Sequence, residues 1–240
     1  MKLEVLSLIF KSTKYLKFTE EQMLKYCTNF DDVEVTNRII ANDATKAVLD
    51  AIPDCKIPVW EFNNPNPQEY YINRVYRAYN YAVKTSEADL VVLVNSDNAY
   101  HEGWLKPLVD WHKKGYLPVS RLIESGKLLS GTNGISKNFG VSPDNYDEEG
   151  FKSWANATMD SSVLNGGLYM PAIFDRNEFI SAGMYPEGNI YNNGVGTCHG
   201  SVMFPGDVWF FRKFEQKTGR KHITLNNSYA YHIQEGEKDE

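Results

Sequence analysis

The stretch Asp89-Leu-Val-Val-Leu-Val-Asn-Ser-Asp97 decides the fold class of this 240-residue chain. Its apolar run, Leu90 to Val94, shows no polar alternation, which is typical of a strand covered on both faces in a parallel sheet. Asn95, Ser96 and Asp97 follow where the strand leaves the sheet, and open α/β sheets bind ligands at the carboxyl ends of their strands. These side chains are therefore a candidate site, although a loop aspartate more often only shapes a turn.

Strands and helices alternate on both sides of this stretch. Apolar runs at 3–10, 33–40 and 57–62 predict strands before it. A long helix is expected over 68–84, between the last of these runs and Asp89. A helix with Trp104 and Trp111 on its apolar face follows. This alternation is typical of βαβ units, so we predict an α/β fold, a single Rossmann-like domain with a mostly parallel central sheet flanked by helices.

Local signals place two helix starts in the first half. Thr19-Glu-Glu-Gln22 has the form of a capping box, so a helix is expected from Thr19 to about Asn29. Asp43 is expected to cap a helix over 44–52.

The pattern changes beyond Trp111, where glycine, serine and asparagine become frequent. The predicted elements are a strand at 116–123, a surface excursion over 125–147, a helix at 145–157, a strand at 166–174, a helix that Asp175 caps and that ends at Gly183, a helix at 205–219 and a strand at 222–233. The glycine- and asparagine-rich segment 185–205, which contains Cys198 and His199, is predicted to be a mobile lid.

Asp207 lies at the start of the 205–219 helix. A negative charge is favoured there, and the pKa of such a carboxyl tends to be lowered. The simplest interpretation of Asp207 from these residues alone is a capping aspartate.

The phosphate loops of many nucleotide-binding α/β proteins are missing, because neither G-x-G-x-x-G nor G-x-x-x-x-G-K-[ST] occurs. Any nucleotide must be held in another way. A divalent cation, Mg or Mn, bridging a strand-end aspartate and phosphate oxygens is the expected substitute.

Composition limits the function classes. A net charge of -6 without a cluster of Lys and Arg argues against broad nucleic-acid binding. Three distant cysteines, Cys27, Cys55 and Cys198, are in no metal-ligand spacing and indicate reduced thiols. The N-terminal run carries Glu4 and predicts a strand rather than a signal peptide, and no apolar stretch is long enough to span a membrane. We therefore expect a cytoplasmic protein, with peripheral attachment to a membrane left open.

Four segments in order resemble the family-2 glycosyltransferases of the GT-A fold, and the resemblance covers roughly 3–236. Ile39-Ile-Ala-Asn-Asp-Ala-Thr45 is similar to the loop that binds the base and ribose. Asn80 followed by Ala88 to Asp97 resembles the strand that ends in the D-x-D motif. Gly206-Asp-Val-Trp-Phe-Phe-Arg212 is similar to the segment that carries the catalytic base. Tyr231-His232 resembles the late metal-binding histidine.

The resemblance implies an inverting, divalent metal-assisted transfer of a sugar from a nucleotide diphosphate sugar, with a UDP-sugar expected most, to a hydroxyl of a glycan, a glycolipid or another acceptor. Asp207 would be the base, and Asp97 and His232 would hold Mn or Mg. The donor would contact Asn42, Asp43, Asn80, Asn95, Ser96 and Asp97. The acceptor or lid would involve Gly167, Arg176, Glu187 and His199. Residues up to about 115 would form the nucleotide-binding half, and 116–240 the acceptor-binding and catalytic half.

Two positions depart from the family pattern. Asn95 stands at the first D-x-D position, and Gly206 stands where a glutamate usually precedes the base. These departures keep open a second class, a catalytically silent carbohydrate- or nucleotide-binding module of the same fold. A sugar nucleotidylyltransferase is disfavoured, because its glycine-rich basic loop is absent after Phe10.

Overall fold

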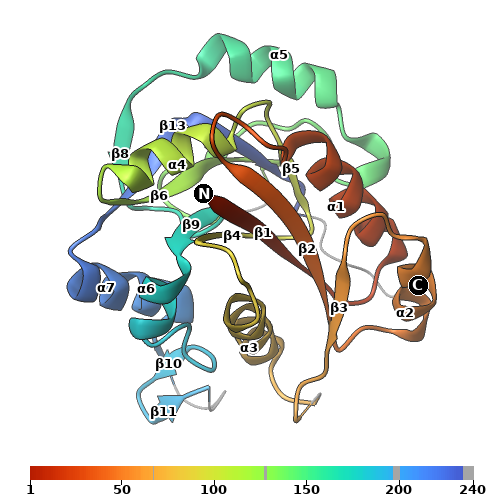
Figure 1. The fold of residues 1–240 in the computed structure, drawn as a ribbon, viewed down its shortest axis with the longest axis vertical. Helices are drawn as coiled ribbons and strands as arrows, with labels where there is room; N and C mark the ends of the chain where they lie inside the picture. Colours follow the sequence, from red (N-terminus) through yellow and green to blue (C-terminus); the bar gives the residue numbers. More distant parts are fainter. Residues whose placement is uncertain (67, 127–128, 197–200, 235–240) are drawn as a thin grey trace.

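The computed structural model describes residues 1–66, 68–126, 129–196 and 201–234. One large twisted sheet runs through the molecule (Figure 1). Its strands are β1 (Lys2–Ile9), β2 (Glu34–Asn42), β3 (Val59–Phe62), β4 (Leu90–Val94), β5 (Asn98–Tyr100), β6 (Tyr116–Glu124), β7 (Ile135–Ser136), β8 (Val163–Asn165), β9 (Ala172–Asp175) and β13 (Lys221–His232). The main path has the order β3-β2-β1-β4-β9-β6-β13-β5, while β7 pairs with β6 and β8 with β13.

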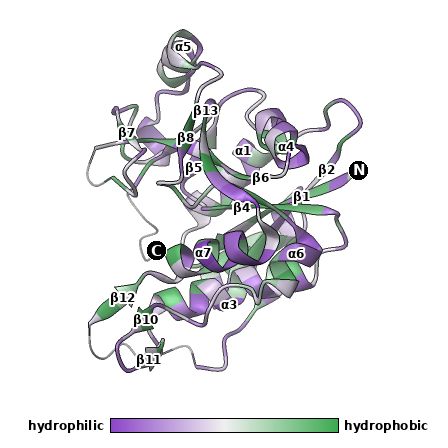
Figure 2. Ribbon diagram, turned by 90° about the vertical axis from the view of Figure 1, so that its left-hand side faces the viewer, coloured by the Kyte–Doolittle hydropathy of each residue, from purple (hydrophilic) through white to green (hydrophobic). Residues whose placement is uncertain are grey.

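Helices cover both faces of this sheet. They are α1 (Thr13–Tyr26), α2 (Lys46–Ala51), α3 (Tyr71–Lys84), α4 (Leu105–Lys113), α5 (Glu148–Thr158), α6 (Arg176–Ser181) and α7 (Gly206–Thr218), with short 3₁₀ turns at Ile52–Asp54 and Pro143–Asn145. Figure 2 shows α1 and α4 on one face and α3, α6 and α7 on the other. This layered arrangement confirms the predicted α/β class, with a mostly parallel central sheet flanked by helices.

The first four strands form a parallel block in the order β3-β2-β1-β4. β1 pairs in parallel with both β2 and β4, and β2 pairs in parallel with β3. All five residues of β4 are buried, as the uninterrupted apolar run predicts for a strand covered on both faces. Because these strands are parallel, the ends of β1, β2 and β4 meet at one edge of the sheet.

The other half of the sheet mixes directions. β9 lies between β4 and β6 and runs antiparallel to both. β5 follows the predicted site loop and pairs antiparallel with β13 from the far end of the sequence. The sequence gives no signal for β5, because three residues are too few to show a period and their pairing is supplied by β13.

Helix α1 begins six residues before the position that the capping box predicts. Ser12 is its N-cap residue, and the Ser12 hydroxyl accepts a hydrogen bond from the backbone N–H of Tyr15 at 3.3 Å. The prediction that Thr19 opens the helix is therefore wrong. Thr19 is buried inside α1, and its hydroxyl donates to the carbonyl of Ser96 at 2.8 Å, which is a tertiary contact instead of a cap.

We expect Ser12→Ala to lower the free energy of unfolding by about 1 kcal/mol, because the substitution removes a side-chain cap from a helix start. Urea unfolding followed by circular dichroism measures the change. Ser153→Ala, at an exposed site inside α5, is the matched control and should change the value by less than about 0.5 kcal/mol. Equal effects of the two substitutions would contradict the cap.

One further prediction for the second half needs correction. The strand expected at 166–174 begins only at Ala172, because Gly166 and Gly167 adopt positive φ and interrupt the extended backbone after β8. The described part of the segment predicted as a lid contains a small antiparallel sheet. Its strands are β10 (Ile190–Tyr191), β11 (Gly194–Val195) and β12 (Val202–Phe204), in the order β11-β10-β12.

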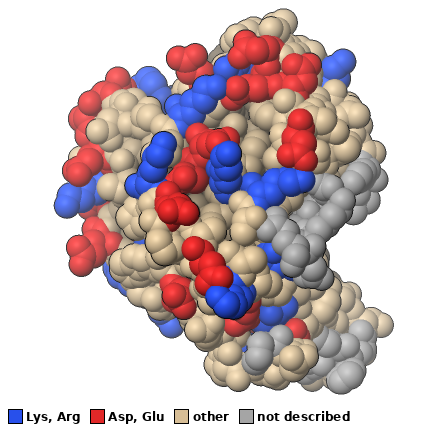
Figure 3. Space-filling view, turned by 90° about the vertical axis from the view of Figure 1, so that its right-hand side faces the viewer, with Lys and Arg blue, Asp and Glu red and all other residues tan. Residues whose placement is uncertain are grey.

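The surface has mixed charge on the face that Figure 3 shows, where Lys and Arg side chains lie among Asp and Glu. Within the part of the chain that the structure describes, no helix is long and apolar enough to cross a membrane. Cys27 and Cys55 are free thiols, and Cys198 lies outside the described residues.

Candidate active site

A pocket of about 750 Å³ lies at the edge where β1, β2 and β4 end. Four separate parts of the chain and the end of β13 form its walls. Its lining residues are Leu8, Ile9, Phe10, Lys11, Asn42, Tyr71, Arg74, Val75, Tyr79, Asn95, Ser96, Asp97 and His232. The structure thus brings five of the predicted site residues, Asn42, Asn95, Ser96, Asp97 and His232, into one pocket, at the place where open α/β sheets bind ligands.

The loop after β4 is held from several sides. The Tyr79 hydroxyl donates to the Val94 carbonyl at 2.8 Å. The Asn95 N–H donates to the Asn98 side chain at 3.1 Å, and the Ile233 N–H donates to the Asp97 carbonyl at 3.1 Å. These contacts fix the backbone of the loop, so the Asp97 side chain has a defined position in the pocket.

Asp97, His232 and Glu124 form two linked ion pairs across the end of the sheet. One Asp97 carboxylate oxygen, Oδ2, lies 3.1 Å from Nε2 of His232, and Nδ1 of His232 lies 3.0 Å from Oε1 of Glu124. Glu124, at the end of β6, is fully buried and also accepts hydrogen bonds from the backbone N–H and the hydroxyl of Ser130. The histidine is therefore fixed between two carboxylates.

This arrangement sets the charge of its members. Burial by itself would lower the pKa of His232, but the negative charges and hydrogen bonds of Asp97 and Glu124 raise it to about 10. For Glu124, burial opposes ionisation, whereas His232 and Ser130 lower the pKa below its ordinary value. Both carboxylates thus favour the charged form of the His232 ring.

The same residues fit a divalent cation. In the part of the chain that the structure describes, no cluster of three or more His, Cys, Asp and Glu side chains could hold a metal ion by itself. Mg²⁺ and similar cations, however, are often bound by one or two protein side chains together with substrate phosphates. Asp97 and His232 both line the pocket, and Glu124 orients the ring of His232 as a carboxylate does behind many metal-binding histidines. A cation held by these two side chains would need further ligands, such as phosphate oxygens.

Glu124 was not predicted from the sequence. The only available signal is a carboxylate that follows the apolar strand at 116–123, just as Asp97 follows β4. Its role becomes visible only because β6 and β13 pair in parallel, with His232 opposite Glu124.

We expect Glu124→Gln to weaken the manganese-dependent binding of UDP by about 10- to 100-fold, because groups that orient a metal-binding histidine typically have effects of this size. Titration calorimetry with UDP and Mn²⁺ measures the affinity. Glu4→Gln is the matched control, because Glu4 is also shielded and paired with a cation, Arg38, but lies near the start of β1. A Glu124 variant with unchanged affinity would rule out this role.

Asp43 supports the pocket wall from behind. The sequence predicts it as a helix cap, but Thr45 is the N-cap residue of α2, and Asp43 has a positive φ of 49°. Its carboxylate accepts hydrogen bonds from the backbone N–H and side-chain amide of Asn64 and pairs with Arg74 at 3.2 Å. The cap prediction is therefore wrong, because tertiary partners occupy the carboxylate.

Arg74 is a pocket residue that the sequence did not reveal. Its guanidinium is held by Asp43 and lies 5.0 Å from the centre of the Phe10 ring. Asn42, beside them, has its amide oxygen fixed by the side chain of Asn64 at 2.8 Å. A flat cation, an aromatic ring and an oriented amide at one end of the pocket suit recognition of a planar base.

Asn80 lies elsewhere. Its side chain donates to the Tyr185 carbonyl at 2.9 Å and accepts from the Tyr185 N–H at 3.0 Å. Both ends of the amide are thus used to hold the backbone at Tyr185, and Asn80 does not line the pocket of Asp97.

Asp207 is at the start of α7, against Tyr76 of α3. Its N–H donates to the Tyr76 hydroxyl at 3.0 Å, and its carboxylate accepts from the N–H of Val208 at 2.7 Å. Burial raises the pKa of Asp207 above its ordinary value, and the two backbone N–H groups offset this only in part. The prediction of a lowered pKa is wrong, because desolvation of the carboxylate outweighs the favourable helix end.

Asp207 does not line this pocket. It contacts Tyr76, which is on the same helix, α3, as the pocket residues Val75 and Tyr79.

Close packing around residue 206 explains why a glycine precedes Asp207. A Cβ atom at Gly206 would lie 2.3 Å from the Tyr76 ring and 2.7 Å from the carbonyl oxygen of Gly188. The glutamate that the family pattern expects at this position therefore cannot fit beside Tyr76. Gly206 is part of the packing of α3 against α7, which explains this departure in structural terms.

The four residues predicted for the acceptor or lid are dispersed. Gly167 lies against Asn133 in the loop after β8. Arg176 lies at the opposite edge of the sheet, because β9 runs antiparallel to β4 and its end pairs with Leu90. Arg176 therefore has no place near the pocket. Glu187 is exposed and pairs with Arg77 at 3.1 Å, whereas His199 is outside the described residues.

Comparisons with known proteins bear on the fold. No model of a known protein family matches the sequence, and no curated protein sequence matches it. The structure is similar to that of TarS from S. aureus, with a TM-score of 0.60 and 14% identity over 97% of this chain and 36% of TarS. It is also similar to residues 1–349 of TarS in complex with UDP, with a TM-score of 0.60 and 15% identity over 96% of this chain and 60% of that one.

A third structure, GalNAc-T7 with UDP, GalNAc and Mn²⁺, gives a TM-score of 0.58 at 13% identity and covers 97% of this chain and 44% of that chain. This protein thus corresponds to between about a third and three fifths of the length of these chains. The likeness confirms that the chain has the GT-A fold, as the resemblance of its four segments predicted.

Proposed function

We propose that the protein transfers a sugar from a nucleotide diphosphate sugar, preferably a UDP-sugar, to a hydroxyl group of an acceptor, with inversion at the anomeric carbon. The observation that carries the proposal is the meeting of Asn42, Asn95, Ser96, Asp97 and His232 in one pocket at the carboxyl edge of a GT-A sheet. TarS and GalNAc-T7, which have similar folds, each have a structure with UDP bound. A glycan, a glycolipid or another hydroxyl compound is the acceptor class.

In this proposal, the two ends of the pocket bind different parts of the donor. Asn42, Arg74 and Phe10 would contact the base and ribose. Asp97 and His232 would hold Mn²⁺ or Mg²⁺ together with the diphosphate. When bound, this cation would stabilise the negative charge that develops on the leaving diphosphate.

Asp207 would act as the general base. The acceptor oxygen attacks the anomeric carbon from the side opposite the diphosphate, the bond from that carbon to the diphosphate oxygen breaks, and the acceptor proton moves to the Asp207 carboxylate. An alcohol is a weak nucleophile near neutral pH, and a base with a raised pKa accepts its proton more readily. The burial of Asp207 therefore suits this role better than that of a surface cap.

The segment 185–204 would cover the donor. Two contacts connect its small sheet to α3 and to the start of α7: the Asn73 side chain donates to the Gly196 carbonyl at 2.9 Å, and the Gly206 N–H donates to the Asn189 side chain at 3.0 Å. Closure of this segment would exclude water, which otherwise competes with the acceptor.

The first test is the metal dependence of nucleotide binding. We expect UDP to bind with Mn²⁺ and to lose at least about tenfold in affinity in excess chelator, because two protein ligands and the diphosphate share the cation. Titration calorimetry with and without EDTA measures this. Equal affinity in both conditions would contradict a bridging cation.

The second test separates the enzyme from a silent module of the same fold. The position of Asn95 keeps this alternative open, because Asn supplies no charge to the metal site. Release of labelled sugar from a panel of UDP-sugars with Mn²⁺ and mixed acceptors is the measurement. Binding of UDP without turnover of any donor would favour the silent module.

A further inference from the structure

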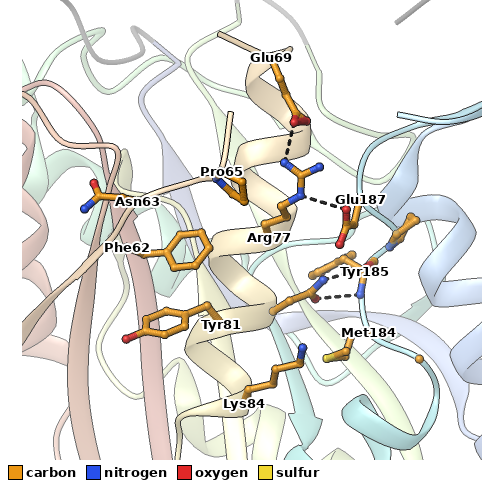
Figure 4. Close-up of a pocket in the computed structure, with 13 residues that line it drawn as sticks. Phe62, Asn63, Pro65, Glu69, Arg77, Tyr81, Lys84, Met184, Tyr185 and Glu187 are labelled. Carbon is orange, nitrogen blue, oxygen red and sulfur yellow. Dashed lines mark hydrogen bonds and ion pairs between the residues drawn. The ribbon is translucent and has the colours of Figure 1, made fainter. Parts of the chain in front are cut away.

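A second groove of about 650 Å³ lies on another face of α3 (Figure 4). Its lining residues are Phe62, Asn63, Pro65, Glu69, Arg77, Asn80, Tyr81, Lys84, Gly183, Met184, Tyr185, Pro186 and Glu187. It shares no residue with the pocket of Asp97, because Arg77, Tyr81 and Lys84 lie on a different side of α3 from Tyr71, Arg74 and Val75. The groove is therefore separate from the pocket of Asp97, although residues 185–187 of its wall also begin the segment proposed to cover the donor.

One wall of the groove is an aromatic pair. The rings of Phe62, at the end of β3, and Tyr81, on α3, stack with their centres 4.7 Å apart and an angle of 25° between their planes. Both side chains are only partly buried, and Figure 4 shows them together on one side of the groove. Stacking orients both rings and covers the faces that touch, so the pair forms an apolar plate made of ring edges and outer faces that solvent can reach.

Polar side chains of α3 and of the segment 183–187 line the rest of the groove. Arg77 lies between two carboxylates, 2.7 Å from Glu69 and 3.1 Å from Glu187. Asn73 donates a further hydrogen bond to Glu69 at 3.1 Å, and Glu187 is 66% exposed. Donors and acceptors are thus held in defined positions toward solvent, as in sites that recognise polar ligands by orientation.

The charges of the groove select the class of ligand. Two carboxylates, Glu69 and Glu187, balance two cations, Arg77 and Lys84, so the lining is neutral overall. A phosphate or a nucleotide would face both carboxylates, and a cation would face Arg77. A neutral ligand with an apolar ring face and many hydroxyls matches the plate on one side and the fixed polar groups on the other. Sugar rings have this combination.

We propose that this groove binds a neutral oligosaccharide, with a sugar ring on the Phe62 and Tyr81 plate and its hydroxyls on Glu187 and Arg77. The volume of the groove is within the range of ordinary ligand pockets. The proposal goes beyond sugar transfer, because a glycan can bind here whether or not the pocket of Asp97 turns over a donor. The wall formed by 183–187 also places the bound glycan beside Tyr185, whose ring stacks on Tyr76 next to Asp207.

The test measures glycan binding and nucleotide binding separately. Cellotetraose, maltotetraose, xylotetraose and chitotetraose are screened against the full chain by saturation-transfer NMR, and the affinity of any binder is measured by titration calorimetry. Tyr81→Ala is expected to lower that affinity by about tenfold, because it removes half of the aromatic plate. Glu187→Gln, an exposed change that leaves the fold intact, should lower it by about fivefold. The affinity for UDP with Mn²⁺ should stay unchanged in the Tyr81 variant.

Trp60→Ala is the matched control, because Trp60 is a 41% exposed aromatic residue on the same strand, β3, but does not line the groove. Its glycan affinity should equal that of the wild type. Three results would each overturn the proposal: no binding of any of the four glycans, glycan binding that survives both groove substitutions, or glycan binding that UDP displaces. If the wild type does not bind UDP or does not transfer sugar, that result contradicts only the proposed transferase function.

Discussion

Asp207→Asn should lower the rate of sugar transfer by about 10²–10⁴-fold, because it deletes the proposed proton acceptor and general bases contribute factors of this size. The amide keeps the shape of the side chain and its hydrogen bond from the Val208 N–H. Folding and UDP affinity should therefore stay close to those of the wild type. Initial rates of sugar release, thermal melting and UDP titration measure the three properties on one sample.

Asp175→Asn is the matched control for this substitution. Asp175 also lies at a helix start, where its carboxylate accepts from the N–H of Glu178 at 2.9 Å, but it is at the far edge of the sheet. The Asp175 variant should retain full transfer. If Asp207→Asn retains most of its rate as well, Asp207 is not the base.

The pH dependence follows from the same residue. Burial raises the pKa of Asp207 in the folded protein, so the folded state binds this proton more tightly than the unfolded state. This contribution to stability is fully present below the unfolded pKa and is lost as the pH rises through the folded pKa. At neutral pH the buried charge is unfavourable, and Asp207→Asn should leave the unfolding free energy unchanged or raise it. Transfer should fall on the acid side at a pH above the ordinary range of an aspartate.

Asp97→Asn should weaken manganese-dependent UDP binding by about 30-fold or more, because the loss of one partner of a shielded charge pair typically changes binding by about 2–5 kcal/mol. Asp97 is the only carboxylate among the residues that line the pocket, and its side chain is only 14% exposed. Its replacement removes a charged ligand of the cation and one of the two partners of His232. Titration calorimetry with UDP at fixed Mn²⁺ measures the loss.

Asp89→Asn provides the matched control, because Asp89 directly precedes the same strand at its opposite end and accepts a hydrogen bond from the N–H of Lys2 at 2.8 Å. Its UDP affinity should be unchanged. The prediction for Asp97 also requires that the variant and the wild type bind UDP with similar, weak affinity in EDTA. A loss of the same size in EDTA would show that Asp97 contacts the nucleotide without a cation.

Local sequence patterns determined the fold class and one edge of the site. The apolar run of β4 is unambiguous because burial on both faces excludes polar residues from the strand. Parallel strands bring their carboxyl ends to the same edge, so Asn42 at the end of β2 and Asp97 after β4 meet in one pocket, as the resemblance to the family implied. The end of α7 was equally clear, since Gly219 adopts the left-handed conformation that follows many helices.

Other site features depend on contacts between residues far apart in the chain. Glu124 acquires its role only when β6 and β13 pair, and Arg74 only when α3 brings it to Asp43. Arg176 was misplaced because the direction of β9 is not encoded in its own residues.

The pKa values of the site residues also depend on contacts between distant parts of the chain. The helix start predicts a lowered pKa for Asp207, but desolvation of the carboxylate in the folded protein reverses the direction. The raised pKa of His232 likewise needs both Asp97 and Glu124 within hydrogen-bond distance. Hydrophobic periodicity is a local property that the sequence carries by itself, whereas desolvation and the field of neighbouring charges exist only once distant segments have packed together.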